Sequence, residues 1–420
     1  MADVTAAAAP VVERRGGLVL TGHRIMVPLD HDHPSGETIE VYAREVASAD
    51  GGDKPYLVFL QGGPGGESPR PSTAPIGPGW IARAVRDYRV LLLDQRGTGL
   101  STPVSSSDSR TAQEYAEYLA NFRADSIVRD CELLREHLGV ERWSLLGQSF
   151  GGFCALNYLS RFPDSLAEVM FTGGVPPVGL SVDEIYAATY ERTAELVERH
   201  YARFPGDRDA VRRIVDLLEG PTGRVELPDR TPLSTRRFRQ LGAGLGMSYG
   251  SEQLHYLLER DPQSPMFAAA VGGLLPFPAS TPIYTVLHEA CYADGGVTGW
   301  SCDRVMPSSF RDDPTMLTAE HPFPWLLDEV WGLHRLRKVA DLLAARDWPK
   351  LYDAQVLARN EVPCAAAVYY DDPYVLRQHS MATAELLGGM RPWITNEFLH
   401  DGLRADARVL DRLISSVRER

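Results

Sequence analysis

The chain has 420 residues, of which 44% are hydrophobic and 24% charged, and its formal net charge is -13. This hydrophobic content is sufficient for a buried core and excludes disordered and collagen-like proteins. The length exceeds that of one minimal domain and is typical of a core domain with an inserted subdomain. Because the charge balance is acidic and the sequence has no basic run, we predict that nucleic acid is not a partner.

The N-terminal residues 1–17 contain alanines but no apolar segment of signal-peptide type, and their arginines follow the small residues. We therefore expect a cytoplasmic location. No stretch approaches about 18 consecutive apolar residues, which predicts that the chain does not span a membrane. The five cysteines are scattered and include no Cys-x-x-Cys pair, so we expect buried free thiols. A disulfide between Cys291 and Cys302, or a metal site, is the alternative.

Two β-like runs at residues 18–28 and 38–46 flank a turn-rich segment and predict a hairpin. His31 and His33 lie in that turn. Histidines at i and i+2 beside aspartates can bind a metal ion. We interpret both as solvated turn residues.

The apolar run at residues 56–60 has the character of a strand that is buried on both faces. It leads into the glycine-rich loop 61–66, whose main-chain N–H groups can form half of an oxyanion hole. Phosphate binding is excluded because the loop fits neither G-x-x-x-x-G-K-[ST] nor G-x-G-x-x-G. A third run, 88–94, is followed by a turn. We interpret Asp94 and Arg96 as structural residues that hold this turn by charge-assisted hydrogen bonds.

Residues 111–138 place apolar side chains at every third or fourth position and predict a helix that ends at Gly139. The apolar run that starts at Trp143 then ends at Gly147-Gln-Ser-Phe-Gly151. Glycine two residues either side of a turning residue allows a sharp strand-to-helix turn, because side chains there would collide. The spacing predicts that Ser149 is this turning residue, with its hydroxyl at the positive end of the following helix.

Strands and helices alternate up to about residue 180, which predicts crossover connections and a mostly parallel sheet with helices on both faces. From residue 181 to 350 the alternation stops and the chain becomes helix-rich and polar. It resumes in 351–420. We therefore predict an α/β core in residues 1–180 and 351–420, with a mainly helical cap in 181–350.

A serine, an acid and a histidine follow three strands of the predicted core, in the chain order of α/β hydrolases. Serine is a poor nucleophile unless an imidazole removes its proton, and a buried carboxylate must hold that imidazole in one tautomer. Ser149, Asp372 and His400 fit these roles. Because the end of a strand cannot be fixed to one residue, Asp371 is the alternative acid.

Five motifs together resemble those of the proline iminopeptidases, which are serine peptidases of the α/β-hydrolase superfamily, and especially their larger bacterial subgroup. The motifs are Gln61-Gly-Gly-Pro-Gly, Asp94-Gln-Arg-Gly-Thr-Gly-Leu-Ser, Gly147-Gln-Ser-Phe-Gly-Gly, Val368-Tyr-Tyr-Asp-Asp and His400-Asp-Gly. The resemblance extends from about Leu18 to the C-terminus. It departs from the commoner family pattern at Gln61, where that pattern has histidine.

The resemblance implies that the protein removes N-terminal proline from short peptides through an acyl-enzyme, without a metal or organic cofactor. In this scheme the amides of Gly62 or Gly63 and of Phe150 stabilise the oxyanion. An aminopeptidase must also bind a protonated amine. We take Glu289, Glu252 and Glu397 as candidate amine ligands, and Tyr284, Tyr292 and Trp300 as a candidate apolar seat for the proline ring.

Three alternatives remain on the same fold: a carboxylesterase, a tripeptidyl-type aminopeptidase and a non-catalytic ligand-binding homologue. The intact set of serine, acid and histidine disfavours the last of these. The sequence makes no prediction of the oligomeric state.

Overall fold

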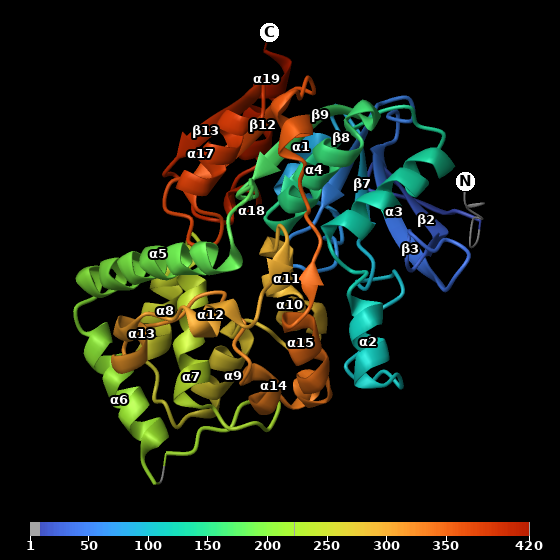
Figure 1. Ribbon diagram of the computed structural model, residues 1–420. Coiled ribbons are helices and arrows are strands. Elements are labelled where there is room, and N and C mark those ends of the chain that lie inside the picture. The colour runs from blue at the N-terminus through green and yellow to red at the C-terminus, as the bar shows by residue number, and fades with distance from the viewer. Residues whose placement is uncertain (1–8, 222, 420) are drawn as a thin grey trace.

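The computed structural model describes residues 9–221 and 223–419 and contains a nine-stranded sheet (Figure 1). Part of the N-terminal segment on which the expected location depends, residues 1–8, lies outside the described residues. From one edge of the sheet to the other, the strands are β1 (Val11–Arg15), β2 (Leu18–Pro28), β3 (Thr38–Ser48), β7 (Arg89–Asp94), β4 (Tyr56–Leu60), β8 (Trp143–Gln148), β9 (Leu166–Thr172), β12 (Cys364–Tyr369) and β13 (Met390–Thr395).

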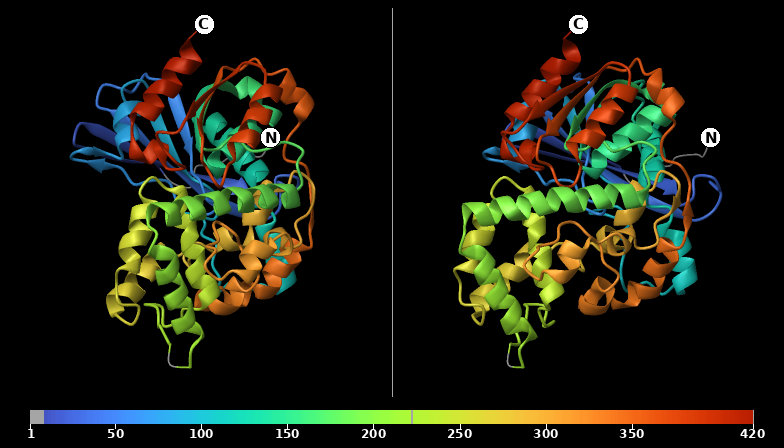
Figure 2. Two further views of the ribbon diagram at one scale, coloured as in Figure 1. Left: turned by 90° about the vertical axis from the view of Figure 1, so that its left-hand side faces the viewer. Right: turned by 60° about the vertical axis from the view of Figure 1, so that its left-hand side comes forward.

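The first three strands of this order pair with antiparallel neighbours, and every pairing from β7 to β13 is parallel. The mostly parallel sheet and the N-terminal hairpin are therefore confirmed. Because parallel strands end at a common edge, the segments that follow β4, β8, β9 and β12 meet there. This edge faces the inserted helices (Figure 2).

Side chains alternate between the two faces of the central strands. In β4, Val58 and Leu60 join one hydrophobic cluster, whereas Leu57 and Phe59 join another on the opposite face. Helices cover both faces. The first cluster includes residues of α2 (Ala112–Leu119), α3 (Ala124–His137), α4 (Phe150–Arg161), α16 (Ala354–Ala358) and α17 (Arg377–Leu386), and the second includes α1 (Gly79–Ala84), α18 (Gly402–Ala405) and α19 (Arg408–Arg418).

The chain between β9 and α16 forms the inserted helices, which lie below the sheet in Figure 1. They are α5 (Val182–Arg203), α6 (Asp207–Glu219), α7 (Thr235–Arg239), α8 (Gly250–Leu258), α9 (Pro265–Leu274), α10 (Pro282–Val286), α11 (His288–Tyr292), α12 (Ser301–Arg304), α13 (Ser308–Asp312), α14 (Leu326–Glu329) and α15 (Arg337–Ala344). A third hydrophobic cluster lies wholly within residues 190–317. The longest helix, α5, runs along the boundary between the inserted helices and the sheet.

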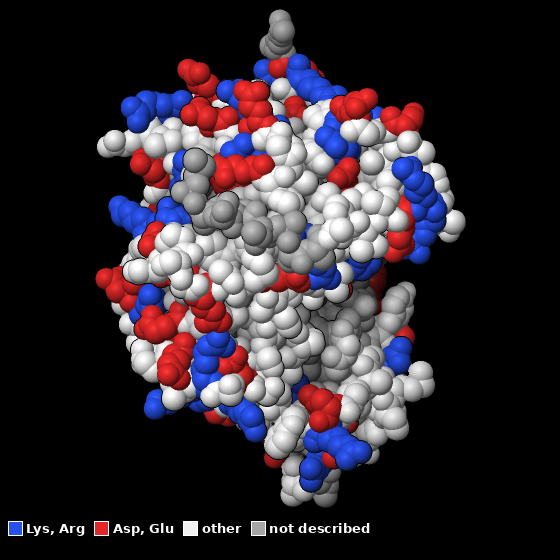
Figure 3. All heavy atoms as spheres, turned by 90° about the vertical axis from the view of Figure 1, so that its right-hand side faces the viewer, with Lys and Arg blue, Asp and Glu red and all other residues white. Residues whose placement is uncertain are grey.

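Short elements complete the fold. They are the strand pairs β5 (Ser72–Thr73) with β6 (Ile76–Gly77) and β10 (Gly296–Val297) with β11 (Asp347–Trp348), and the 3-10 turns η1 (Pro163–Ser165), η2 (Gln240–Gly246) and η3 (Trp331–Leu336). None of the helices in the described residues is both long and apolar enough to cross a membrane. On the described part of the face in Figure 3, acidic and basic side chains are interspersed without a continuous basic area.

All five cysteines lie in the described part of the chain, where each is buried and none forms a disulfide. Cys291 and Cys302 are therefore free thiols in this structure. Burial raises the pKa of every one of the five thiols above its ordinary value.

The helix predicted over residues 111–138 is two helices, α2 and α3, with a break at residues 120–123. The side chain of Arg96, from the loop after β7, reaches this break and donates to the Asn121 carbonyl at 2.7 Å. The prediction of one continuous helix was wrong because this tertiary hydrogen bond fixes a turn that the apolar periodicity does not reveal.

Arg96 is fully buried and forms a bidentate ion pair with Asp130 of α3, with N···O distances of 2.6 and 2.7 Å. Nε2 of His31 lies 2.9 Å from Asp130 Oδ1, and the His31 side chain is only 8% exposed. The prediction that His31 is a solvated turn residue was therefore wrong, because the turn folds back onto α3. His33 remains exposed. Within the described residues, no group of three or more His, Cys, Asp or Glu side chains is arranged to hold a metal ion.

We predict that Asp130→Ala lowers the free energy of unfolding by about 3–5 kcal/mol, because it leaves the buried charge of Arg96 without its partner. Asp32→Ala is the matched control, since Asp32 pairs with Arg129 at the surface and should change stability by less than about 1 kcal/mol. Urea denaturation followed by tryptophan fluorescence measures both. Equal shifts of the two midpoints would contradict the structural role of the buried pair.

Candidate active site

Ser149 lies at the turn between β8 and α4, with a φ of 54° and a ψ of -126°. A non-glycine residue rarely adopts this conformation, so the surrounding packing must hold it. The neighbouring glycines allow that packing. A Cβ on Gly151 would lie 1.9 Å from the Leu60 carbonyl oxygen, and one on Gly147 would lie 2.6 Å from the Gly151 carbonyl oxygen. The predicted strand-to-helix turn is present, and only glycine fits at positions 147 and 151, two residues before and after Ser149.

His400 and Asp372 form a buried pair beside this turn. Nδ1 of His400 lies 2.7 Å from Oδ2 of Asp372, and both residues are buried. The other carboxylate oxygen of Asp372 accepts the main-chain amides of Tyr374 and Val375 at 2.9 and 3.0 Å. These contacts satisfy the carboxylate and leave Nδ1 as the ring nitrogen that faces it. The second ring nitrogen, Nε2, is free to act on another group.

Asp371, the alternative acid, points elsewhere. Its carboxylate pairs with Arg199 of α5 at 2.7 Å and with Arg192 at 3.4 Å. Of the two adjacent acids, Asp372 is therefore the one in contact with His400.

The pKa of His400 is raised above its ordinary value of 6.5. Burial alone would lower it, but the charge of Asp372 and its hydrogen bond favour the protonated imidazole, and the charge of Glu320 adds to this effect. The environment therefore strengthens His400 as a base.

Ser149 and His400 line one cavity of about 320 Å³. Its other lining residues are Gln61, Gly62, Gly63, Pro64, Gly66, Gln148, Met247, Pro278, Thr281, Tyr284, Glu320 and Arg404. The described residues show no hydrogen bond between Ser149 and His400. Such contacts are often long without substrate and tighten in the bound complex.

The glycine-rich loop after β4 approaches the serine closely. A Cβ on Gly62 would lie 2.9 Å from the Ser149 Cβ. The Gly62 amide donates to Oε1 of Gln61 at 3.0 Å, and Nε2 of Gln61 donates to the Glu67 carbonyl at 2.9 Å. The Gly62 amide thus already donates a hydrogen bond to the side chain of Gln61. No partner is recorded for the amides of Gly63 and Phe150 within the described residues.

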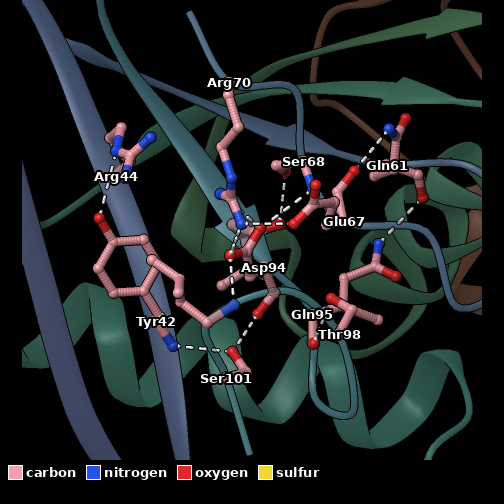
Figure 4. Close-up of polar contacts among 12 residues, drawn as sticks. Tyr42, Arg44, Gln61, Glu67, Ser68, Arg70, Asp94, Gln95, Thr98 and Ser101 are labelled. Atoms are coloured by element: carbon pink, nitrogen blue, oxygen red, sulfur yellow. Dashed lines mark hydrogen bonds and ion pairs between the residues drawn. The ribbon is translucent and has the colours of Figure 1, made fainter. Parts of the chain in front are cut away.

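A buried carboxylate, Asp94, holds the segment that directly follows this loop (Figure 4). Its oxygens accept the Ser68 amide at 3.0 Å, the Arg70 guanidinium at 2.7 and 3.1 Å, and the Leu100 amide at 2.9 Å. Gln95 donates to the Gln61 carbonyl at 3.0 Å. Asp94 therefore fixes the loop that borders the cavity.

Of the six residues predicted to bind substrate, Tyr284 alone lines this cavity. The Glu289 carboxylate is buried and accepts the Cys302 amide at 2.9 Å, and Tyr292 is buried with its hydroxyl 3.2 Å from the Tyr374 carbonyl. The structure does not bring the remaining three to the cavity: Glu252 pairs with Arg203, Trp300 donates to Asp341, and Glu397 borders a separate groove with Trp393 and Phe398.

Glu320 is a cavity residue that the sequence did not reveal. Its side chain is 20% exposed, it accepts the Tyr284 hydroxyl, and it lies 3.7 Å from Nε2 of His288. Burial would raise its pKa, but the hydrogen bonds of His288 and Tyr284 and the charges of His288 and His400 hold that pKa below its ordinary value. Glu320 is thus an anion in the cavity. It belongs to an irregular segment between α13 and α14, where no periodic pattern marks it.

The sheet topology, the turn at Ser149 and the buried pair of Asp372 and His400 define an α/β-hydrolase-fold protein. The family model for the alpha/beta hydrolase fold matches residues 55–210. A proline iminopeptidase of Aeromonas sobria is 44% identical over 95% of this chain and 96% of its own length. One from Aspergillus aculeatus is 33% identical over 91% and 90%. This chain therefore belongs to the proline iminopeptidase family, which confirms the resemblance seen in the motifs.

Among solved structures, a bromoperoxidase from Bacillus anthracis has a TM-score of 0.42 at 15% identity, covering 94% of this chain and 100% of that chain. This likeness adds nothing to the family assignment.

We predict that Asp372→Asn lowers the pKa of His400, because the variant removes the charge that opposes burial. Asp371→Asn is the matched control and should leave that pKa unchanged. Carbon-13 NMR titration of labelled histidine measures both, with the signal assigned by its loss in His400→Gln. A larger effect of Asp371→Asn would contradict the assignment.

The same shift links pH to stability. Since the pKa of His400 is higher in the folded protein, its contribution to stability is fully present below the ordinary value of 6.5 and is lost as the pH rises through the raised pKa.

Proposed function

We propose that this protein is a serine aminopeptidase that removes N-terminal proline from short peptides. The observation that carries the proposal is the cavity that Ser149 shares with His400, whose ring is hydrogen-bonded to a buried carboxylate. The two relatives that match over about nine-tenths or more of this chain, both named proline iminopeptidase, support the choice of substrate.

In the acylation step, Ser149 Oγ attacks the carbonyl carbon of proline, and its proton passes to Nε2 of His400. Asp372 stabilises the imidazolium that forms and keeps Nδ1 protonated. When the tetrahedral intermediate collapses, the C–N bond breaks and Nε2 gives its proton to the leaving amine. The products are the shortened peptide and a prolyl ester of Ser149.

In the second step, water attacks the prolyl ester while His400 accepts its proton. The C–O bond to Ser149 then breaks, and His400 returns the proton to Ser149 Oγ. Proline leaves and the starting state is restored.

Two main-chain amides are suited to stabilise the oxyanion, those of Gly63 and Phe150, because neither has a recorded partner among the described residues. Phe150 is the first residue of α4, so the positive end of that helix adds to the effect. The Gly62 amide is a weaker candidate because Gln61 already occupies it.

Glu320 is suited to bind the protonated nitrogen of the N-terminal proline. It is an anion in the same cavity as Ser149, and Tyr284 and His288 hold its carboxylate in place. The apolar surfaces of Met247, Pro278 and Tyr284 also line the cavity and offer contacts to the proline ring.

We also propose that residues 181–350 form a cap over the core of residues 1–180 and 351–420, and that the protein is cytoplasmic. The first rests on the group of helices between β9 and β12, and the second on the composition of the N-terminal residues. The absence of a nucleic-acid partner stays a prediction from the acidic charge.

We predict that the protein hydrolyses proline 2-naphthylamide faster than alanine 2-naphthylamide and p-nitrophenyl acetate. Ser149→Ala should lower the rate by at least about 1,000-fold and abolish labelling by a serine-directed phosphonate. Ser107→Ala, at an exposed serine, is the matched control and should retain both. Cleavage of the ester alone would favour a carboxylesterase, and a folded wild-type protein that takes no label would refute the serine mechanism.

We predict that Glu320→Gln lowers kcat/KM for proline 2-naphthylamide by about 10- to 100-fold, because a charged partner of the substrate amine is lost. N-acetylproline 2-naphthylamide lacks that charge, so its slow cleavage should change far less. Glu259→Gln is the control, since Glu259 is an exposed acid at the end of α8. Equal losses on both substrates would show that Glu320 does not recognise the amine.

A further inference from the structure

Arg404 is a cation in the site cavity that neither the fold nor the proposed chemistry uses. It lies on α18, four residues after His400, and its side chain is exposed. Its recorded side-chain contact is Nη2 to the Met247 sulfur at 3.6 Å. No carboxylate forms a salt bridge with it within residues 9–221 and 223–419.

The cavity therefore contains two opposite charges, Glu320 and Arg404. Both act on His400, whose pKa the charge of Glu320 raises and the charge of Arg404 lowers. Glu320 comes from the irregular segment between α13 and α14, and Arg404 comes from α18 in the core. A substrate in the cavity of Ser149 thus meets a lining that includes one cationic and one anionic side chain.

We propose that Arg404 binds the C-terminal carboxylate of the substrate, so that the protein prefers proline dipeptides with a free carboxylate. This inference rests on the proposed function. A dipeptide is a zwitterion, and its amine fits Glu320 while its carboxylate fits Arg404. The guanidinium can bind a carboxylate through two parallel hydrogen bonds.

The size of the cavity agrees with a short substrate. In a dipeptide the carboxylate is one residue beyond the scissile bond, and each added residue moves it away by about 3.3–3.6 Å. The cavity of about 320 Å³ is at the small end of the range for ligand pockets, which also favours short substrates.

The test compares Pro-Gly with Pro-Gly-amide, which differ only in the terminal charge. We expect wild-type kcat/KM to be about fivefold higher for Pro-Gly, as for an ion pair that is partly exposed to solvent. Arg404→Gln should reduce this ratio to about one, mainly through a higher KM for Pro-Gly. Arg404→Lys should restore part of it. Because each ratio is taken within one variant, a general loss of folded enzyme cancels.

Arg408→Gln is the matched control. Arg408 is an exposed arginine on α19 that pairs with Asp406 and borders the separate groove, so the variant should keep the wild-type ratio. A wild-type ratio of one, or an unchanged ratio in Arg404→Gln, overturns the inference. Proline 2-naphthylamide has no carboxylate, so its cleavage in either of those cases would leave the proposed function intact. Failure to cleave it would instead remove the proposed function.

Discussion

The whole site depends on a steric constraint, the close approach of main-chain segments around Ser149. A Cβ on Gly152 would lie 2.1 Å from the Gly174 carbonyl oxygen, and one on Gly151 would collide with the end of β4. Because these glycines have no side chains, α4 can begin directly against the ends of β4 and β9. The serine is thereby forced out of the sheet and toward the cavity.

Electrostatic interactions set the protonation of the groups that line the cavity. Burial alone would lower the pKa of His400. The buried carboxylate of Asp372 opposes this effect, so the pKa of the imidazole is raised above its ordinary value. A second carboxylate, Glu320, is kept ionised by His288 and Tyr284. The serine and histidine come from the core, whereas Glu320 comes from the irregular segment between α13 and α14. The cavity is therefore lined by two different parts of the chain.

Local sequence patterns predicted the sheet and the turn at Ser149 because their causes are local: apolar runs and glycines at fixed spacing. The order of Ser149, Asp372 and His400 also followed from strand ends. The wall of the cavity could not be predicted in this way. Glu320 reaches the cavity only through tertiary packing of an irregular segment, and Glu289, chosen from a family-like stretch, instead binds the amide of Cys302. The break between α2 and α3 was also missed, because Arg96, which donates a hydrogen bond to the Asn121 carbonyl there, comes from the loop after β7.

The five buried cysteines have a consequence for how the protein responds to its surroundings. Only a thiolate reacts readily with oxidants and alkylating reagents, and burial disfavours the thiolate at every one of these positions. None of them lines the cavity of Ser149. A thiol reagent would therefore reach these cysteines where the fold opens, and inactivation by such a reagent would measure that opening.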